Sequence, residues 1–477
     1  MRIGVVVGFV STVLKSMAPI LLIPVLVGYV YGEPTTTIQP FISAAILSLL
    51  IGYALGFAAK SEKATTKEAM VAVALGWILA CMVGALPFTS VGMNYLDAVF
   101  ESVAGFTTTG TTLLLRIQGI PKSVLFWRAF IQWVGGLGII ASFSVFLTGA
   151  ANKLLPQIFF AETSKIESQQ VTQNASTMIK ALWVVYLGLT VLEIIALSLL
   201  GVGLFDAVTH SFTTVSTGGF STYAASIAAF NNVGVEAVVV IFMFLGGLNF
   251  VVLNNFLKNK RKINFETKLY VGVIVAASAL IGADLAFNGA SGFQAVRESV
   301  FQVVSIMTTT GYTTANFIAW PKLSQMLLVG LMVVGGCAGS TGGGIKVIRF
   351  GLLGKLAWRE IRKVSLPKLS LNKVKIGSKI VGDETLHAVA ALFTLWIALL
   401  FVGGAITAAA TGYPVFESFS GMASALGNIG PSLIPASEIP LLPDAVKFTY
   451  MIGMLAGRLE IIPLLVLLHP SGWKRFP

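Results

Sequence analysis

Charge is scarce in this sequence. Of its 477 residues only 11% are charged, and only 20 are acidic, whereas 56% are hydrophobic. A soluble globular chain carries about 25% charged residues. A mean hydropathy of +0.86 and many apolar runs that reach the ~20 residues needed to cross a bilayer predict a polytopic membrane protein. We expect the apolar N-terminus to be a retained spanning helix, because no small-residue cleavage signature follows it.

Residues that commonly hold metals or carry out catalysis are also scarce. The two cysteines, Cys81 and Cys337, lie in apolar segments, and the three histidines, His210, His387 and His469, show no ligand spacing. They predict neither a disulfide framework nor a metal site, and no constellation of His, Cys and Asp supports an enzyme. The formal net charge is +12. Because the basic residues gather in the loops of one side, they indicate membrane orientation rather than nucleic-acid binding.

One short, uncharged polar pattern that ends in glycine occurs four times. Its members are Thr108, Thr109 and Gly110; Thr217, Gly218 and Gly219; Thr309, Thr310 and Gly311; and Asn428, Ile429 and Gly430. An acid stands thirteen positions before each of the four final glycines. These acids are Asp97, Asp206, Glu298 and Glu417. With so few acids in the chain, four at one offset are not expected by chance, so we infer a fourfold internal repeat.

The repeat predicts an all-α membrane protein in which four copies of helix, pore half-helix and helix surround one central pore. Ten apolar segments are long enough to span, and the segments after the four acids are not. We expect two extra N-terminal transmembrane helices in 1–64, repeats in 65–155, 175–262, 263–355 and 386–477, and a basic cytoplasmic linker in 356–385. The half-helices are expected at 97–106, 206–215, 298–307 and 417–426. Return helices are expected at 125–148, 234–257, 323–350 and 445–468. The Lys and Arg asymmetry of the loops predicts that both termini are cytoplasmic.

The polar stretches suit a dehydrated cation. Irregular backbone at membrane depth is tolerated only where it is buried in protein or lines water. Four such stretches around one axis can offer rings of carbonyl oxygens that replace the hydration shell of a monovalent cation. We expect glycine because inward-facing carbonyls require positive φ. The four acids at the half-helix N-termini complement the helix dipole, and we prefer this structural role to direct ion binding.

Each return helix also contains glycine 24 to 27 residues after the final glycine of its polar stretch, so we expect all four to break or thin at a similar depth. Close helix packing explains this in the first two repeats. The third repeat has too many small residues for a regular helix, so we expect 336–344 to form a gating loop across the inner vestibule. The expected gate residues are Gly336, Gly339, Ser340, Thr341, Gly342, Gly343, Gly344 and Arg458. Arg458 either faces the pore, where its charge slows a cation, or forms an ion pair with Glu460, Glu193 or Asp284.

At these motifs the chain resembles the superfamily of K+ transporters that contains TrkH, KtrB and the plant HKT proteins. The matching segments are 108–110, 218–222, 310–317, 427–431, 335–349 and 456–461. The two extra N-terminal spans make it more similar to TrkH than to KtrB. The resemblance implies that the twelve residues of the four polar stretches form the K+ selectivity filter. Asn428 and Ile429 depart from the Thr-Thr pattern, which predicts a less regular filter in the fourth repeat.

The resemblance also implies K+ uptake by a multi-pass protein of the plasma membrane (the prokaryotic inner membrane). It implies a homodimer with one pore per subunit in the lipid bilayer, regulated by a cytoplasmic, nucleotide-binding TrkA-like ring. K+ is then the transported ion, and no organic cofactor is expected. In HKT proteins a serine at the first filter glycine goes with Na+ transport, so Gly110 implies K+ selectivity. Two mechanisms remain open: a channel-like pore, and a symporter coupled to Na+ or H+ through mid-span acids such as Glu193, Asp284 and Glu460.

Overall fold

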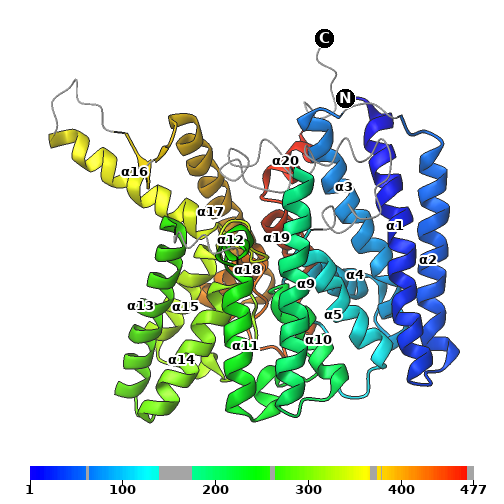
Figure 1. The fold of residues 1–477 in the computed structure, drawn as a ribbon, viewed down its shortest axis with the longest axis horizontal. Coiled ribbons are helices and arrows are strands. Elements are labelled where there is room, and N and C mark those ends of the chain that lie inside the picture. Colours follow the sequence, from blue (N-terminus) through cyan, green and yellow to red (C-terminus); the bar gives the residue numbers. More distant parts are fainter. Residues whose placement is uncertain (61–63, 139–174, 258–263, 366–372, 378, 470–477) are drawn as a thin grey trace.

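The structure is a computed structural model, which describes residues 1–60, 64–138, 175–257, 264–365, 373–377 and 379–469. The end of the first expected return helix, 139–148, and the basic loops at 153–165 and 258–262 lie outside these residues. Helices dominate the described chain (Figure 1). The first helix begins and the last helix ends at the same end of the molecule, at the top of Figure 1.

Two long helices form the expected N-terminal hairpin beside the first repeat. They are α1 (Ile3–Val30) and α2 (Thr35–Gly56), and they form one flank of the molecule with α3 (Thr66–Gly84). Glu33 in the turn accepts hydrogen bonds from the backbone N–H (3.0 Å) and the hydroxyl of Ser123, at the start of the first return helix. Because this carboxylate caps that helix, the hairpin is anchored to the first repeat.

The four repeats share one plan. The outer helices are α3, α9 (Ala175–Leu199), α13 (Phe265–Phe287) and α17 (Asp383–Thr411). The half-helices are α4 (Tyr95–Phe106), α10 (Leu204–Val215), α14 (Gly292–Met307) and α18 (Val415–Gly427). The return helices are α5 (Lys122–Gly136), α11 (Val233–Gly246), α15 (Lys322–Val334) and α19 (Asp444–Arg458). Short 3-10 turns η1 (Leu86–Val91), η3 (Ser226–Phe230), η4 (Phe317–Ala319) and η5 (Ile439–Leu441) complete the connections.

The second, third and fourth return helices break at or beside the glycines where the sequence predicts a break, so 234–257, 323–350 and 445–468 are not single helices. After α11 the chain bends by 104° into α12 (Phe250–Leu257). α15 ends at Val334, because Gly335 has a φ of 75°. α19 is separated from α20 (Ile462–Leu468) by Leu459 and by two residues of positive φ, Glu460 and Ile461. Because these return helices are broken, none of the three crosses a membrane as one straight helix. Six other described helices are long and apolar enough to cross alone, and the bent pair α11 and α12 makes a seventh if it counts as one span.

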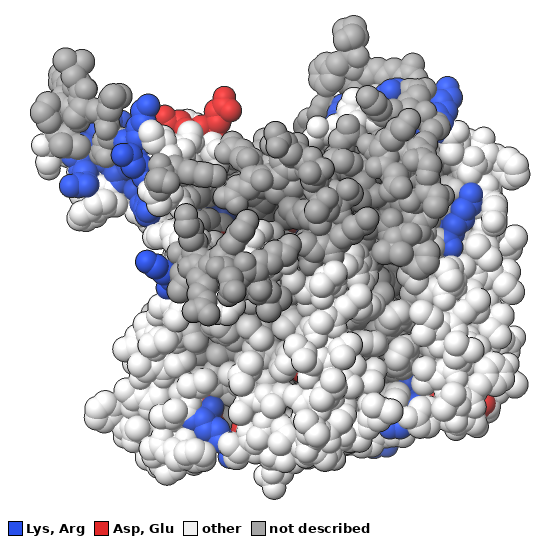
Figure 2. All heavy atoms as spheres, viewed as in Figure 1, with Lys and Arg blue, Asp and Glu red and all other residues white. Residues whose placement is uncertain are grey.

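A basic helix leaves the body of the molecule after the third repeat. α16 (Val347–Ser365) projects at the upper left of Figure 1, and Figure 2 shows Lys and Arg gathered there, above a body with little surface charge. The helix carries Arg349, Lys355, Arg359, Arg362 and Lys363. A small antiparallel hairpin follows, in which β1 (Lys375–Ile376) pairs with β2 (Lys379–Ile380), with Lys375 opposite Ile380.

Candidate functional site

All four half-helices end in the same hydrogen-bond pattern. In each repeat the N–H of the residue before the final glycine donates to a carbonyl oxygen in the last turns of the half-helix, at 2.8 to 3.0 Å. The pairs are Thr109 to Ala104, Gly218 to Thr213, Thr310 to Ser305, and Ile429 to Ser424. Because the N–H groups point back to the helix, the carbonyl groups of the polar stretches are directed away from it.

Two backbone positions in each stretch have positive φ. The four final glycines have φ values of 79°, 75°, 81° and 102°, in chain order, so the prediction of positive φ at Gly110, Gly219, Gly311 and Gly430 is confirmed. The residues two positions earlier, which are not glycine, have φ between 54° and 60°. They are Thr108, Thr217, Thr309 and Asn428. Such a conformation costs about 1–3 kcal/mol at a non-glycine residue and persists only where the surroundings impose it.

The four stretches close into one ring. A Cβ atom added to each final glycine would lie 1.8 to 2.6 Å from a carbonyl oxygen of another repeat. The contacts run from Gly110 to Gly218 (2.1 Å), from Gly219 to Thr310 (1.9 Å), from Gly311 to Ile429 (1.8 Å) and from Gly430 to Thr109 (2.6 Å). The order is therefore one to two, two to three, three to four, and four back to one. We call the oxygens of Thr109, Gly218, Thr310 and Ile429 the carbonyl ring, and the position of each oxygen in it a corner of the ring.

The fourth repeat keeps the backbone pattern of the others. Asn428 has a φ of 55°, like the threonines at the equivalent positions, because asparagine tolerates the left-handed region better than most residues. The irregularity expected from Asn428 and Ile429 is instead small and lies at Gly430, whose φ of 102° is the largest of the four. Its contact with repeat one, at 2.6 Å, is also the longest in the ring.

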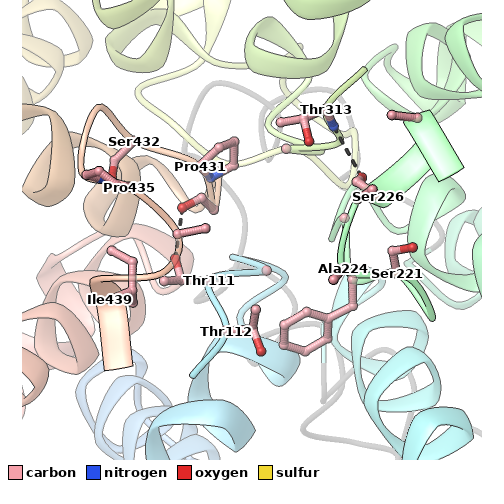
Figure 3. Close-up of a pocket in the computed structure, with 18 of the residues that line it drawn as sticks. Thr111, Thr112, Ser221, Ala224, Ser226, Thr313, Pro431, Ser432, Pro435 and Ile439 are labelled. Atoms are coloured by element: carbon pink, nitrogen blue, oxygen red, sulfur yellow. Dashed lines mark hydrogen bonds between the residues drawn. The ribbon is translucent and has the colours of Figure 1, made fainter. Parts of the chain in front are cut away.

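A cavity of about 690 Å³ opens directly on the ring. All four final glycines line it, together with segments that follow them in every repeat. Figure 3 shows these segments surrounding the hollow from four sides. The Thr111 hydroxyl donates to the Gly430 carbonyl (3.1 Å), and the Thr313 N–H donates to the Ser226 hydroxyl (3.2 Å). Hydrogen bonds between repeats therefore hold the rim of the cavity.

A buried ion pair supports the ring between repeats one and two. Arg128 of α5 is 1% exposed and Glu101 of α4 is fully buried, and Arg128 Nε lies 2.9 Å from Glu101 Oε1. Arg128 also donates to the Ser221 carbonyl (3.1 Å), and Glu101 accepts from the Thr112 hydroxyl (2.8 Å). Neither residue was predicted to be functional. The available signal was an acid inside a half-helix, nine positions before its final glycine.

The residue nine positions before the final glycine differs in every repeat. Where repeat one has Glu101, repeat two has His210, whose Nε2 lies 2.9 Å from the Ser221 hydroxyl. Ser221 follows Gly219 by two positions, as Thr112 follows Gly110, so the two contacts are equivalent. In repeat four the position is Gly421, and the Tyr450 hydroxyl takes the space, since an added Cβ would lie 2.1 Å from it.

Three of the four acids predicted at half-helix N-termini lie in the first turn: Asp97, Asp206 and Glu417. Asp97 also pairs with Lys447 of α19 at 2.7 Å, and Asp206 accepts hydrogen bonds from Thr222 (2.7 Å) and Tyr223 (2.9 Å). The prediction is wrong for Glu298. α14 begins six residues earlier, at Gly292, because Ser291 caps it.

The glycines of the return helices lie against the ends of the half-helices. An added Cβ would lie 1.9 Å from the Phe106 carbonyl at Gly135, 3.1 Å from the Val215 carbonyl at Gly246, and 2.0 Å from the Leu426 carbonyl at Gly457. In these three repeats, close packing of small residues accounts for the glycine.

In the third repeat the chain between α15 and α16 lies directly beneath the polar stretches. The Gly343 N–H donates to the Thr309 hydroxyl (2.6 Å). The Thr341 hydroxyl donates to the Val215 carbonyl (3.0 Å) and accepts from the Thr217 hydroxyl (3.2 Å). The loop is therefore hydrogen-bonded to the second and third repeats.

Arg458 connects this loop to the first repeat. Its guanidinium donates to the carbonyl oxygens of Thr341 (2.7 Å), Gly135 (2.5 Å) and Gly136 (2.6 Å). Glu460, one of the acids considered as its partner, pairs with Arg349 of α16 at 2.5 Å. Arg458 thus acts as a cross-link beneath the ring, as well as a positive charge there.

A polar pair lies beside the segment of the fourth repeat that lines the cavity. The Tyr413 hydroxyl donates to Glu438 Oε2 (2.5 Å), and burial together with this carboxylate raises the pKa of Tyr413 to about 12. Within the described residues no group of three or more His, Cys, Asp or Glu could hold a metal ion. The oxygen atoms that the ring itself offers to a cation are backbone carbonyls, with threonine hydroxyls nearby.

The fold and the site together define a polytopic membrane protein in which four half-helix repeats surround one central pore. The family model described as "TrkH: Cation transport protein" matches residues 37–272 and 274–474. The chain therefore belongs to the TrkH family of cation transport proteins, in agreement with the resemblance found in its motifs.

Individual relatives agree with this assignment. The chain is 34% identical over 427 residues to the Trk system potassium uptake protein TrkH of Escherichia coli K12, and the match covers 86% of each chain. It is 30% identical over 429 residues to TrkG of the same organism, again covering 86% of each. The crystal structure of the potassium transporter TrkH from Vibrio parahaemolyticus superposes with a TM-score of 0.87 at 30% identity, covering 99% of this chain and 100% of that one.

The buried pair behind the ring predicts a stability effect. Arg128→Met leaves the Glu101 carboxylate buried without its charged partner, which costs about 3–5 kcal/mol. We expect a clearly lower Tm of the purified protein in detergent. Arg359→Met is the matched control, because its partners Glu360 and Asp383 are 49% and 72% exposed and an exposed pair contributes only about 0–1 kcal/mol. Equal losses in the two variants would contradict the proposed role of the pair.

Proposed function

We propose that the protein takes up K+ through a channel-like, K+-selective pore in the plasma membrane. The observation that carries the proposal is the closed ring of main-chain oxygens from Thr109, Gly218, Thr310 and Ile429, each beside the final glycine of another repeat. Carbonyl oxygens around one axis can replace the hydration shell of a monovalent cation. The curated relatives are Trk system potassium uptake proteins, which favours K+ as the transported ion.

The half-helices add to the attraction for a cation. All four end at the polar stretches, and a helix C-terminus carries about half a negative charge. Four such ends around the ring favour a positive ion without a carboxylate in contact with it. The proposed selectivity filter comprises Thr108 to Gly110, Thr217 to Gly219, Thr309 to Gly311 and Asn428 to Gly430.

The proposed gate is the loop 336–344 together with Arg458. The loop lies under the polar stretches of repeats two and three, and Arg458 ties it to repeat one. A loop in this place restricts the path below the ring. A guanidinium beneath the ring also raises the barrier for a cation. Opening then requires the hydrogen bonds of Thr341 and Gly343 to break.

The proposal also covers how the protein is oriented in the membrane and how its subunits assemble. Four basic residues of α16, Lys355, Arg359, Arg362 and Lys363, favour a cytoplasmic position for this helix and for both termini, because cytoplasmic segments are enriched in Lys and Arg. This basic face suits a cytoplasmic regulatory ring of the TrkA type. A homodimer with one pore per subunit completes the arrangement that the family resemblance implies.

A buried acid supports a second candidate, a symporter that couples K+ to Na+ or H+. Glu193 of α9 is fully buried in an outer helix, close to Thr214 of α10. Buried acids within transmembrane segments often mark ion or proton pathways. Reversal potentials measured at varied Na+ and pH distinguish the two mechanisms. A reversal potential that follows the K+ gradient alone supports the channel, and one that shifts with pH or Na+ supports coupling.

The ring geometry predicts the effect of Gly110→Ser. The new Cβ would lie 2.1 Å from the Gly218 carbonyl oxygen at a φ of 79°, so one corner of the ring must move. We expect the preference for K+ over Na+ to fall by about tenfold, which corresponds to ~1.4 kcal/mol. The measurement is liposome flux with K+, Rb+, Na+ and Li+.

Gly119→Ser is the control for that experiment. Gly119 has a φ of 96°, but nothing lies within 4 Å of an added Cβ. The control therefore keeps the backbone strain and omits the contact with the carbonyl ring. An unchanged ion preference in folded Gly110→Ser protein would rule out the filter assignment.

The contacts of Arg458 predict a gating effect. Arg458→Gln weakens the links to Thr341, Gly135 and Gly136, and hydrogen bonds from a charged donor contribute about 1.5–3 kcal/mol each. We expect K+ flux in liposomes to rise about tenfold. Arg362→Gln, on the exposed part of α16, serves as the control. Flux that stays level or falls in folded Arg458→Gln protein would exclude the proposed gate.

A further inference from the structure

Repeat two differs from the others at one position of the carbonyl ring. The residue before the final glycine is Thr109, Thr310 or Ile429 in three repeats, but Gly218 in the second. Gly218 does not have the positive φ that favours glycine. The backbone conformation therefore does not explain why this position has no side chain.

The side chain of Gln132 occupies the space that Gly218 leaves. A Cβ atom added to Gly218 would lie 2.4 Å from Gln132 Cδ, 2.5 Å from its Oε1 and 2.9 Å from its Nε2. Gln132 comes from α5, the return helix of repeat one, and it is fully buried. A residue of the neighbouring repeat thus takes the place of a missing filter side chain.

Both ends of the Gln132 amide bind filter backbone. Nε2 donates to the Gly218 carbonyl oxygen at 2.7 Å, which is a member of the carbonyl ring. Oε1 accepts from the Phe220 N–H at 3.0 Å. One side chain therefore holds the residues on both sides of Gly219 and limits how far the Gly218 carbonyl can turn.

The other repeats show what Gln132 replaces. In repeat one the hydroxyls of Thr107 and Thr109 lie 2.7 Å apart, and in repeat three those of Thr308 and Thr310 lie 2.8 Å apart. Each pair links the end of the half-helix to the residue that supplies a ring carbonyl. Repeat two has Ser216 at the first of these positions and no side chain at the second.

We propose that Gln132 is a positioning residue for ion selectivity, which sets the Gly218 corner of the carbonyl ring from the neighbouring repeat. This inference rests on the proposed function of the ring as a K+ filter. A carbonyl held by a buried amide donor cannot move inward to follow a smaller ion without breaking that hydrogen bond. Gln132 thereby favours K+ over Na+ at one of the four corners.

The first test is Gln132→Leu, which keeps a side chain of similar size and removes both hydrogen bonds. We expect the Na+ to K+ permeability ratio, measured from reversal potentials of the purified protein in planar bilayers, to rise about tenfold. The control is Gln325→Leu. Gln325 is a 2% exposed residue of α15 that donates to the carbonyls of Ile318 and Trp320, away from the carbonyl ring. We expect its permeability ratio to match that of the wild type.

The second test is rescue. Gly218→Thr alone places a side chain in the space that Gln132 occupies. Gln132→Ala alone removes the hydrogen bonds that hold the Gly218 corner of the ring. Combined, the two substitutions make room for a threonine whose hydroxyl can reach Ser216, as the equivalent pairs do in repeats one and three. We expect the double variant to recover most of the K+ preference that Gln132→Ala loses. Gel filtration in detergent checks that each variant is folded.

The outcomes separate the inference from the proposed function. A folded Gln132→Leu protein with the wild-type permeability ratio would overturn the role of Gln132. A double variant no more selective than Gln132→Ala would overturn it as well. If the wild type itself conducts no K+, or does not distinguish K+ from Na+, the proposed function fails instead.

Discussion

Backbone polar groups at membrane depth must find partners, and this requirement shapes the centre of the molecule. Each polar stretch satisfies its N–H groups by returning them to the half-helix before it, at Ala104, Thr213, Ser305 and Ser424. The carbonyl groups are then left without backbone partners and face another environment. Side-chain donors, water or an ion can supply the missing partners, so the same constraint shapes both the fold and the site.

The ring is nearly symmetric, but its supports are not. The φ pattern recurs in all four repeats, yet repeat one relies on Glu101 and Arg128, and repeat two on His210 and Gln132. In repeat four, Asn428 donates to the Thr109 hydroxyl (2.9 Å) and the Met454 carbonyl (2.8 Å). Equivalent glycines therefore do not imply equivalent corners, because each corner is held by side chains from different helices.

The sequence predicted those features of the structure that depend on short local patterns. The half-helices, the register of the four glycines and their positive φ follow from short motifs with strong backbone preferences. The early start of α14 had a local signal that was missed, since the Ser291 hydroxyl caps the helix by accepting from the Gln294 N–H. The roles of Arg128 and Gln132 had no local signal in the sequence. Arg128 contacts Ser221 and Gln132 contacts Gly218, each about 90 positions away along the chain. The breaks in the return helices were visible as glycines, but their angles depend on packing against the half-helices.

The proposed gate and the proposed filter share hydrogen bonds. Thr217 and Thr309 hold the strained, positive-φ position of their stretches, and their hydroxyls bind the loop residues Thr341 and Gly343. Strain at such positions persists only while the surroundings impose it. Movement of the loop would therefore remove part of what holds two corners of the ring in shape. In the proposed mechanism these contacts couple opening below the ring to the geometry of the ring itself, so the proposed regulatory subunit would act on both if it displaced the loop.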